Sequence, residues 1–297
     1  MKIPPGRKVF LIAALIYLTV ISLLCVLPFI NLLAISFSNK NAVALGQVSF
    51  WPVDFTFSSY KFITYNSAFL KALVVSVQRV ILGVGLNLLL IILTAYPLSK
   101  EKEEFRLRSV YSWFFVLTIL FNGGLIPSYL VVRYTGIRDT IWALVLPGAL
   151  PVFSMLVVMN YMRSLPKELS EAAYIDGANH LQTLLKIILP VSTPTIATVA
   201  LFAFVGHWNS WFDGLIYMAR VEHYPLQTYL QTVVIKPEVF FTNTKNVSQS
   251  LVTLLAMVDA RTSAAAQLFL GTIPILCVYP FLQRYFASGL VMGSVKG

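Results

Sequence analysis

The sequence has 297 residues, of which 58% are hydrophobic and only 11% carry a charge, and its mean hydropathy is +0.77. A folded soluble protein leaves much of its surface in water, so this composition excludes an ordinary soluble enzyme, a disordered chain and a disulfide-rich secreted module. The net charge of +10 comes from basic residues scattered between apolar segments, which argues against a nucleic-acid-binding face. The composition predicts an integral membrane protein.

Charged residues mark the ends of the membrane spans, because an ionised side chain at the centre of a bilayer costs several kcal/mol. A helix needs about 20 apolar residues to cross the bilayer, and six stretches are long enough. We therefore predict an all-α membrane protein in which one transmembrane domain covers residues 1–297. The predicted spans are approximately 9–38, 69–98, 109–132, 140–162, 187–219 and 262–284.

The first span follows three basic residues, an arrangement that also occurs in secretory signal peptides. The apolar region of a signal peptide is about 7–15 residues long, whereas this run extends from Val9 to Phe37 without a small-residue cleavage site. We predict a helix that stays in the membrane. Segment 39–68, which follows it, is rich in aromatic residues and is expected to be structured.

The second span contains one internal charge, Arg79. This side chain has three open interpretations: it reaches the outer interface, pairs with an acid on a partner chain, or binds an anionic substrate. The amides of Asn87, Asn122 and Asn160 are expected to form hydrogen bonds between helices, since polar side chains within lipid face other helices or a wet cavity.

Segment 163–189 combines two short helices with a turn. Good helix formers run from Lys167 to Tyr174, Gly177 can adopt a positive φ, and Asp176 beside it is expected to cap the second helix. From Ala178 to Leu189 the apolar residues recur at helical spacing, so this helix is predicted to run into the fifth span. Such an L-shaped piece suits the transmission of force from a partner, or is a plain amphipathic connector at the interface.

The outer part of the fifth span carries an unusual polar and aromatic cluster: Trp208, Asn209, Trp211, Phe212 and Asp213. Aromatic faces together with amides and carboxylates bind sugar rings, whereas tryptophan is also common in the aromatic belt of any membrane protein. We predict a substrate path formed by Asn209, Trp208, Trp211, Asp213, Asn122 and Arg79, with Asn209 as the strongest candidate.

The distribution of basic residues predicts the orientation. With the N-terminus inside, the inner segments hold twelve Lys and Arg over about 60 residues, and the outer segments hold nine over about 80. Both termini and segment 163–189 are then cytoplasmic, and segments 39–68 and 220–261 are outside. Within the latter, Tyr224 to Val234 either folds back toward the helices or forms a solvated loop.

The sequence lacks the residue patterns that several catalytic and cofactor-binding functions require. The sequence contains no GxxxxGK[ST] phosphate loop, so ATP hydrolysis by that route would reside on another chain. His180, His207 and His223 are not at metal-ligand spacing, and we predict no catalytic residue and no metal site. Cys25 and Cys277 lie far apart inside apolar runs and are predicted to be small core residues.

Segment 163–189 also resembles a known signature. It matches the EAA motif of bacterial ABC importer permeases at every fixed position: Glu171, Ala172, Ala173, Gly177, Ile187, Leu189 and Pro190. The rest of the chain is similar to the smaller permease subunit of maltose-type importers and looks most like the subgroup that imports complex or uronate oligosaccharides. This wider likeness is carried by Tyr96–Ser99 (YPLS), Gly123–Pro127 (GGLIP), Trp208-Asn209 and Gln283–Gly297.

In that family the loop is a coupling helix that docks in a cleft of a cytoplasmic ATPase. The resemblance implies that Glu171 pairs with a basic residue of the ATPase, that Ala172 and Ala173 allow close approach, and that Gly177 sets the turn. Asp176, Leu189 and Pro190 complete the coupling set.

The resemblance also implies the partners and the substrate of the transporter. A second homologous permease, two ATPase domains that bind ATP and Mg, and an extracytoplasmic solute-binding protein would work with this chain in the bacterial plasma membrane, among its lipids. The substrate would be an oligosaccharide, including acidic ones from plant or algal polysaccharides. Two alternatives stay open: an ABC permease for a non-sugar solute, and an ion-coupled secondary transporter, although the halves of the sequence show no internal repeat.

Overall fold

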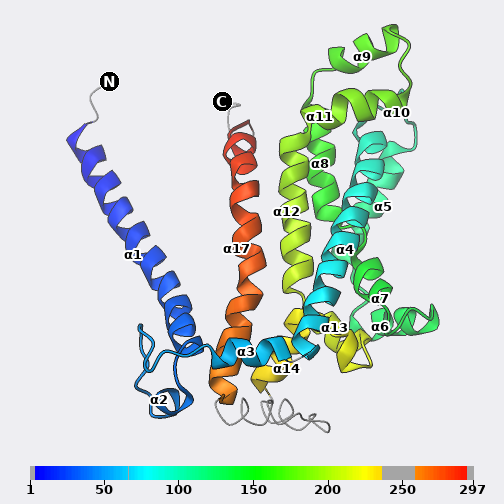
Figure 1. The fold of residues 1–297 in the computed structure, drawn as a ribbon. Coiled ribbons are helices and arrows are strands. Elements are labelled where there is room, and N and C mark those ends of the chain that lie inside the picture. Colours follow the sequence, from blue (N-terminus) through cyan, green and yellow to red (C-terminus); the bar gives the residue numbers. More distant parts are fainter. Residues whose placement is uncertain (1–3, 66, 236–257, 293–297) are drawn as a thin grey trace. The chain divides into compact units, whose positions relative to one another are not determined.

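The computed structural model describes residues 4–65, 67–235 and 258–292, and the regular structure within these ranges is entirely helical (Figure 1). The all-α class predicted from the apolar runs is confirmed. The chain divides into two compact units, one formed by Met1–Leu70 with Leu230–Ile273 and the other by Lys71–Tyr229 with Pro274–Gly297. The part of the predicted outer segment at 236–257 lies outside the described residues.

Among the described residues, three unbroken helices are long and apolar enough to cross a membrane: α1 (Pro5–Ser36), α4 (Ser67–Ser99) and α17 (Ala260–Met292). At about 1.5 Å per residue, each extends beyond the hydrocarbon core of about 30 Å. Cys25 on α1 and Cys277 on α17 are exposed, so the prediction of two core cysteines is wrong. An apolar helix face in a membrane protein needs no burial within the chain, because lipid is as apolar as a protein core.

The other apolar stretches are bent helix pairs. The predicted span 109–132 is two helices, α5 (Arg108–Leu120) and α6 (Leu125–Tyr134), bent by 115°, so its continuity was predicted wrongly. The break contains Gly124 at φ +84°, and Asn122 Oδ1 accepts the Gly124 N–H at 2.8 Å. A residue at positive φ cannot continue a right-handed helix, and glycine adopts this φ without a steric cost.

The predicted span 140–162 is also broken. A first piece, α7 (Ile141–Val145) with η1 (Leu146–Gly148), is followed by α8 (Val152–Ser164) at an angle of 49°. Pro147 and Pro151 interrupt the helical hydrogen bonds there, because proline has no N–H to donate. If each bent pair is counted as one span, the described residues contain up to six spans, the predicted number.

In the first unit, segment 39–68 is structured, as its aromatic content predicted. It contains α2 (Lys40–Ala44) and α3 (Ser58–Tyr65). Phe37 stacks on Phe55 and Tyr60, with ring centroids 5.2 and 4.7 Å apart, and Phe57 packs edge-on against the same group. Such aromatic pairs stabilise the packing beyond their buried area, so this cluster holds the segment together.

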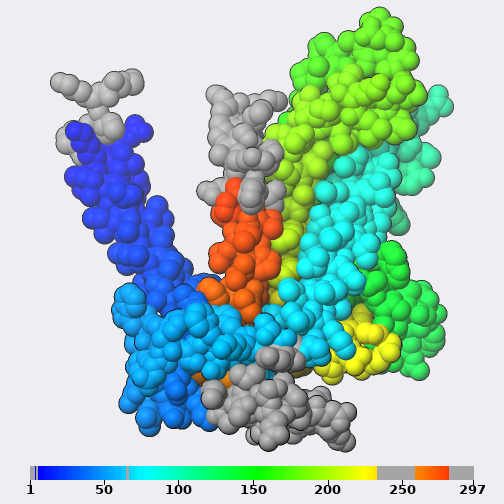
Figure 2. Space-filling model, in the orientation of Figure 1, coloured from blue at the N-terminus to red at the C-terminus, as the bar shows by residue number. Residues whose placement is uncertain are grey.

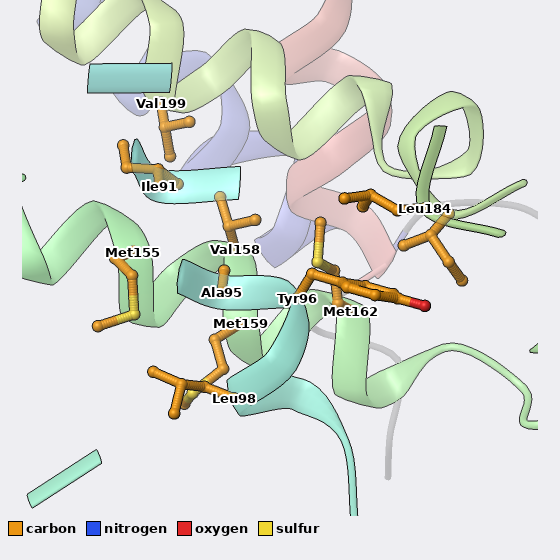
Figure 3. Packing of buried hydrophobic residues seen from close by; sticks show 11 residues of the cluster. Ile91, Ala95, Tyr96, Leu98, Met155, Val158, Met159, Met162, Leu184 and Val199 are labelled. Carbon is orange, nitrogen blue, oxygen red and sulfur yellow. The ribbon is translucent and has the colours of Figure 1, made fainter. Parts of the chain in front are cut away.

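The second unit has its main apolar cluster among α4, α8, the π-helical turn η2 (Leu184–Ile188) and α12 (Thr193–Asn209) (Figure 3). The members that are fully buried or nearly so include Ile91 and Ala95 from α4, Met155 and Val158 from α8, and Val199 from α12. Within lipid there is little hydrophobic gain in bringing apolar helices together, so close van der Waals packing holds them. Leu184 and Ile188 join this cluster, and they anchor the segment that carries the EAA signature.

Candidate functional site

The EAA segment forms an elbow at one tip of the second unit (Figures 1 and 2). Its elements are α9 (Glu168–Ile175), α10 (His180–Thr183), η2 and α11 (Leu189–Val191). Two short helical pieces separated by a glycine turn were predicted, and this is confirmed, with Gly177 at φ +81°. The second piece does not run straight into the next span as predicted, because the chain bends by 81° between His180–Val191 and α12. Pro190 and Pro194 flank this bend and interrupt the helical hydrogen bonds on both sides.

The cap of the second piece is Asn179, so the prediction of Asp176 as the cap is wrong. Asn179 accepts the N–H of Gln182 at 2.9 Å, and the Gln182 side chain accepts the N–H of Asn179 at 2.9 Å, which is a capping box. Asp176 instead ends α9, with its N–H donated to the carbonyl of Ala172 at 3.1 Å. Since Gly177 occupies the left-handed position directly after α9, the next helix begins only later in the chain.

The residues of the signature do not all face the same way. Glu171 and Ala172 are exposed, whereas Ala173 is only 4% exposed and packs within the chain. Ile175, one turn after Glu171, is 87% exposed although it is apolar. At the other end of the segment, Leu189 is half-buried against the apolar cluster and Pro190 is exposed. The outward face of α9 therefore combines a carboxylate with an unburied aliphatic side chain, a combination typical of a docking surface.

Arg79 is buried and pairs with Asp213 of the same chain, a partner that the sequence analysis did not name. Its side chain is 3% exposed, its Nη1 donates to Asp213 Oδ1 and to the carbonyl of Ser210, both at 3.1 Å, and its Nη2 contacts Asp213 Oδ2. The guanidinium of Arg79 is therefore enclosed by this chain and does not extend into solvent. Ser210 lies at the break between α12 and α13 (Phe212–Tyr217), so Arg79 satisfies a carbonyl that the helix leaves without a partner.

Asn87 fulfils the predicted role of an amide that bonds between helices. Its Nδ2 donates to the carbonyls of Gly148 and Ala149 at 3.0 and 2.8 Å, at the break before α8, and its Oδ1 lies 2.9 Å from His207 Nε2 of α12. Arg79, Gly83 and Asn87 are four residues apart and thus share one face of α4. This face, the polar strip, supplies hydrogen bonds to the breaks of two bent helices. Asn122 and Asn160, predicted to act in the same way, are exposed.

Gly83 leaves the space that His207 occupies. A Cβ on Gly83 would lie 2.4 Å from His207 Nε2, so we expect Gly83→Ala to displace the imidazole from Asn87 and to destabilise the protein by about 1–3 kcal/mol. Gly85→Ala is the matched control on the same helix, because nothing lies within 4 Å of its added Cβ. The stability of both variants is compared through the apparent melting temperature of the detergent-purified protein. Equal melting temperatures for the two variants would contradict the steric argument.

The aromatic cluster around the end of α12 is only partly accessible. Trp208 is 2% exposed and stacks on Phe204 with centroids 6.2 Å apart, which makes it a packing residue in this structure. Asn209, the last residue of α12, and Trp211 are exposed, and Asp213 is engaged by Arg79. The predicted span 187–219 is therefore not one helix, and of its four predicted substrate residues only Asn209 and Trp211 present open surface. A contact of any of them with substrate stays a prediction.

Tyr224 to Val234 contains a helix, α14 (Leu226–Ile235), rather than a solvated loop. Within the second unit, the Leu226 N–H donates to Ser76 Oγ at 2.7 Å and the Thr228 hydroxyl donates to the carbonyl of Trp211 at 2.7 Å. Leu226 is fully buried. Of the two interpretations, the one in which this run folds back toward the helices is confirmed for residues 226–229.

Asp139, which the sequence analysis missed, joins two connections between helices. It has a left-handed φ of +61°, and its carboxylate accepts the Ala219 N–H at 3.0 Å and Arg220 Nε at 2.8 Å and lies 3.0 Å from His223 Nδ1. Burial raises the pKa of Asp139, but the hydrogen bonds outweigh this effect and hold the pKa below its ordinary value. An aspartate among polar residues of a short connection gives no sequence signal for such a distant partner.

We expect Asp139→Asn to lower the stability of this cluster at neutral pH, because a neutral amide forms weaker hydrogen bonds with Arg220. A carboxylate with a lowered pKa stabilises the fold above its unfolded-state pKa of about 3.9, and this contribution disappears as the pH falls further. The difference in melting temperature between the native protein and D139N should thus be largest at neutral pH and shrink below about pH 4. A difference that grows on acidification would contradict this prediction.

Comparison with known proteins places the chain in a family. A model of the family described as "Binding-protein-dependent transport system inner membrane component" matches residues 7–212. Protein LplC of Bacillus subtilis (strain 168) is 36% identical over 98% of this chain and 96% of the relative. The polygalacturonan/rhamnogalacturonan transport system permease protein YtcP of the same organism is 35% identical over 95% of this chain and 96% of the relative.

A solved structure is similar along nearly the whole chain. It belongs to a bacterial ABC transporter involved in the import of the acidic polysaccharide alginate, and it matches with a TM-score of 0.85 and 30% identity over 96% of this chain and 99% of that chain. The helical architecture, the elbow with its signature and these three likenesses agree. The chain therefore belongs to the family of binding-protein-dependent transport system inner membrane components, the permeases of ABC importers.

Proposed function

We propose that this protein is the permease subunit of a bacterial ATP-driven importer that moves an acidic oligosaccharide, derived from a plant or algal polysaccharide, across the plasma membrane. The observation that carries the proposal is the similarity, over at least 95% of this chain, to a polygalacturonan/rhamnogalacturonan permease and to a chain of an alginate importer. Both of those proteins belong to transport systems for polymers of acidic sugars. Their identity to this chain, 35% and 30% over nearly the full length, supports a shared class of substrate.

The chain would act with three kinds of partner. A second homologous permease would complete the translocation path, and a solute-binding protein would deliver the oligosaccharide. Two ATPase domains holding ATP and Mg would sit beneath the pair of permeases, one of them at α9 of this chain. The family description supports the solute-binding protein. The exposed carboxylate of Glu171 beside the exposed Ile175 supports the docking of an ATPase at α9.

The proposed orientation follows the distribution of basic residues. The elbow then faces the cytoplasm together with both termini, and the opposite end of the second unit, with α6, α7 and α13, faces outward (Figure 1). An ATPase on one side and a binding protein on the other would thus meet opposite ends of the same helices. This arrangement suits alternating access, in which the path opens to one side at a time.

A ligand shifts the permease between its two states only if it binds one state more tightly than the other. Nucleotide would close the ATPase pair and displace α9, which favours the outward-open path. The loaded binding protein would favour that same state from outside, so that its arrival stimulates hydrolysis. Release of phosphate would return the path to the inward-open state.

The test is reconstitution of the permease with its partner permease, ATPase and binding protein in proteoliposomes. We expect uptake of a labelled oligogalacturonate or oligomannuronate that requires hydrolysable ATP and saturates with substrate. Neutral maltodextrins of the same length are the matched control and should be taken up poorly. Uptake of maltodextrin alone would overturn the acidic substrate, and uptake driven by an ion gradient without ATP would overturn the ABC mechanism.

A further inference from the structure

The two residues that follow α4 contact α9 near both of its ends. Glu101 forms an exposed ion pair with Lys167, which precedes the first residue of α9. Lys100 Nζ donates to the hydroxyl of Tyr174, the penultimate residue of α9, at 3.0 Å. The Lys100 side chain is only 12% exposed, so this second contact is shielded from water.

Lys100 lies at the centre of a compact polar group. Its Nζ is 3.4 Å from Glu104 Oε2, and it lies 5.1 and 5.3 Å from the ring centroids of Tyr96 and Tyr174, within cation–π range. The Tyr174 hydroxyl is in turn 2.9 Å from His180 Nδ1, at the first residue of α10. One lysine thus connects the end of α4 to α9 directly and to α10 through a single hydroxyl.

The end of α4 is itself firmly held. Arg108, at the start of α5, donates to the carbonyl of Lys100 at 2.8 Å, and Arg163, near the end of α8, donates to the carbonyl of Leu98 at 3.0 Å. Cationic donors at the last carbonyls of a helix satisfy groups that have no partner within the helix. These contacts can therefore transmit a displacement of α9 to α4, α5 and α8. They are separate from the covalent connection that runs through α10 and α11 to α12.

Apolar packing is incomplete beside this polar group. A pocket of about 340 Å³ is lined by Leu93, Pro97 and Phe105 and, on the elbow, by Leu181 and Leu184. At this level of the unit, the hydrogen bonds and the cation–π contacts of Lys100 make a direct link between α4 and the elbow.

We propose that Lys100 is a positioning residue for energy coupling, which transmits the displacement of α9 to α4. The inference rests on the proposed function, in which an ATPase moves α9. Because the polar strip of α4 also binds the breaks before α8 and after α12, a movement of α4 would reach the opposite end of the unit. The link would thereby join the docking surface to the part of the path that opens outward.

The test compares Lys100→Met and Tyr174→Phe in the reconstituted complex. Both variants are expected to retain native amounts of permease, copurified ATPase and basal ATP hydrolysis, because the exposed face of α9 is unchanged. The stimulation of hydrolysis by loaded binding protein, and the uptake per ATP, should fall about tenfold in K100M, because this variant removes the charged donor that joins the end of α4 to α9. Y174F keeps the ring and removes only the hydroxyl. The double variant should lose less than the sum of the two single losses, because both substitutions remove the hydrogen bond between Lys100 and Tyr174.

Lys102→Met is the matched control, since it removes an exposed lysine two residues further along and should leave coupling unchanged. Lys100→Arg, which keeps the cation, should recover much of the stimulation. Native stimulation in K100M would overturn the proposal, and so would loss of copurified ATPase, which indicates a structural role. Absence of ATP-dependent uptake by the unaltered complex would instead show that the proposed function is wrong.

Discussion

Glu171→Lys is expected to abolish ATP-dependent uptake and copurification of the ATPase, while the variant still inserts into the membrane and folds. Glu171 is exposed on α9, one turn before the exposed Ile175, so a lysine fits there without a clash. In the proposed complex the carboxylate meets a basic residue of the ATPase. A lysine in its place brings two like charges together at a cost of several kcal/mol, which lowers the affinity at least about 100-fold.

The charge-matched control for this prediction is Glu222→Lys. Glu222 is exposed in the 3₁₀ turn η3 (Val221–His223), which follows α13. Among the described residues it forms one weak ion pair, with Lys71 at 4.0 Å. The same change of charge at this position should leave copurification with a tagged ATPase at the native level. Native uptake and native copurification by E171K would refute the assignment of α9 as the coupling helix.

Arg79→Gln is expected to destabilise the protein by about 3–5 kcal/mol, which lowers both the yield of folded protein and the melting temperature. The substitution leaves the Asp213 carboxylate without its cation, and the carbonyl of Ser210 loses a donor. A partly buried carboxylate without its cation is costly, because removing one partner of an ion pair leaves an uncompensated charge. Asp213→Asn is expected to have a similar effect, since it leaves the buried guanidinium unpaired.

The double variant Arg79→Gln/Asp213→Asn separates an internal ion pair from a substrate site. If the pair acts only within the chain, the double variant should recover most of the stability and should import acidic oligosaccharides. Were Arg79 to bind the carboxylate of the substrate, the double variant would fold and yet fail with acidic substrates. A loss of stability in the double variant that equals the sum of the two single losses would contradict the ion pair between Arg79 and Asp213.

The lengths of the apolar runs predicted the helical class, because a backbone within lipid must satisfy its own hydrogen bonds. The predicted number of six spans is reached among the described residues if each bent pair is counted as one span. The same runs did not predict where helices break. The stretch 109–132 is free of charges and yet bends by 115°, since composition reports that a segment is apolar and not that it is straight. Gly124 and the prolines near 147–151 and 190–194 lie at the breaks of these helices. Their presence does not predict a break, because glycine and proline also occur inside unbroken membrane helices, as Pro28 does in α1.

The elbow could be predicted from the sequence because its chemistry is local: a run of helix formers, a glycine at positive φ and an apolar period lie within about two dozen residues of each other. The sequence could not predict which residues form hydrogen bonds with Arg79, Asn87, Lys100 and Asp139. Arg79 lies 134 residues from Asp213, and Asn87 lies 120 from His207.

The sequence by itself thus determined the class of fold, the lipid environment and the position of the elbow, each of which depends on interactions between neighbours in the chain or with the solvent. Only the tertiary structure decided which polar groups satisfy the broken helices and which side chains remain open to partners. Those choices depend on contacts between distant helices, and many pairings of a few polar residues are compatible with one sequence pattern.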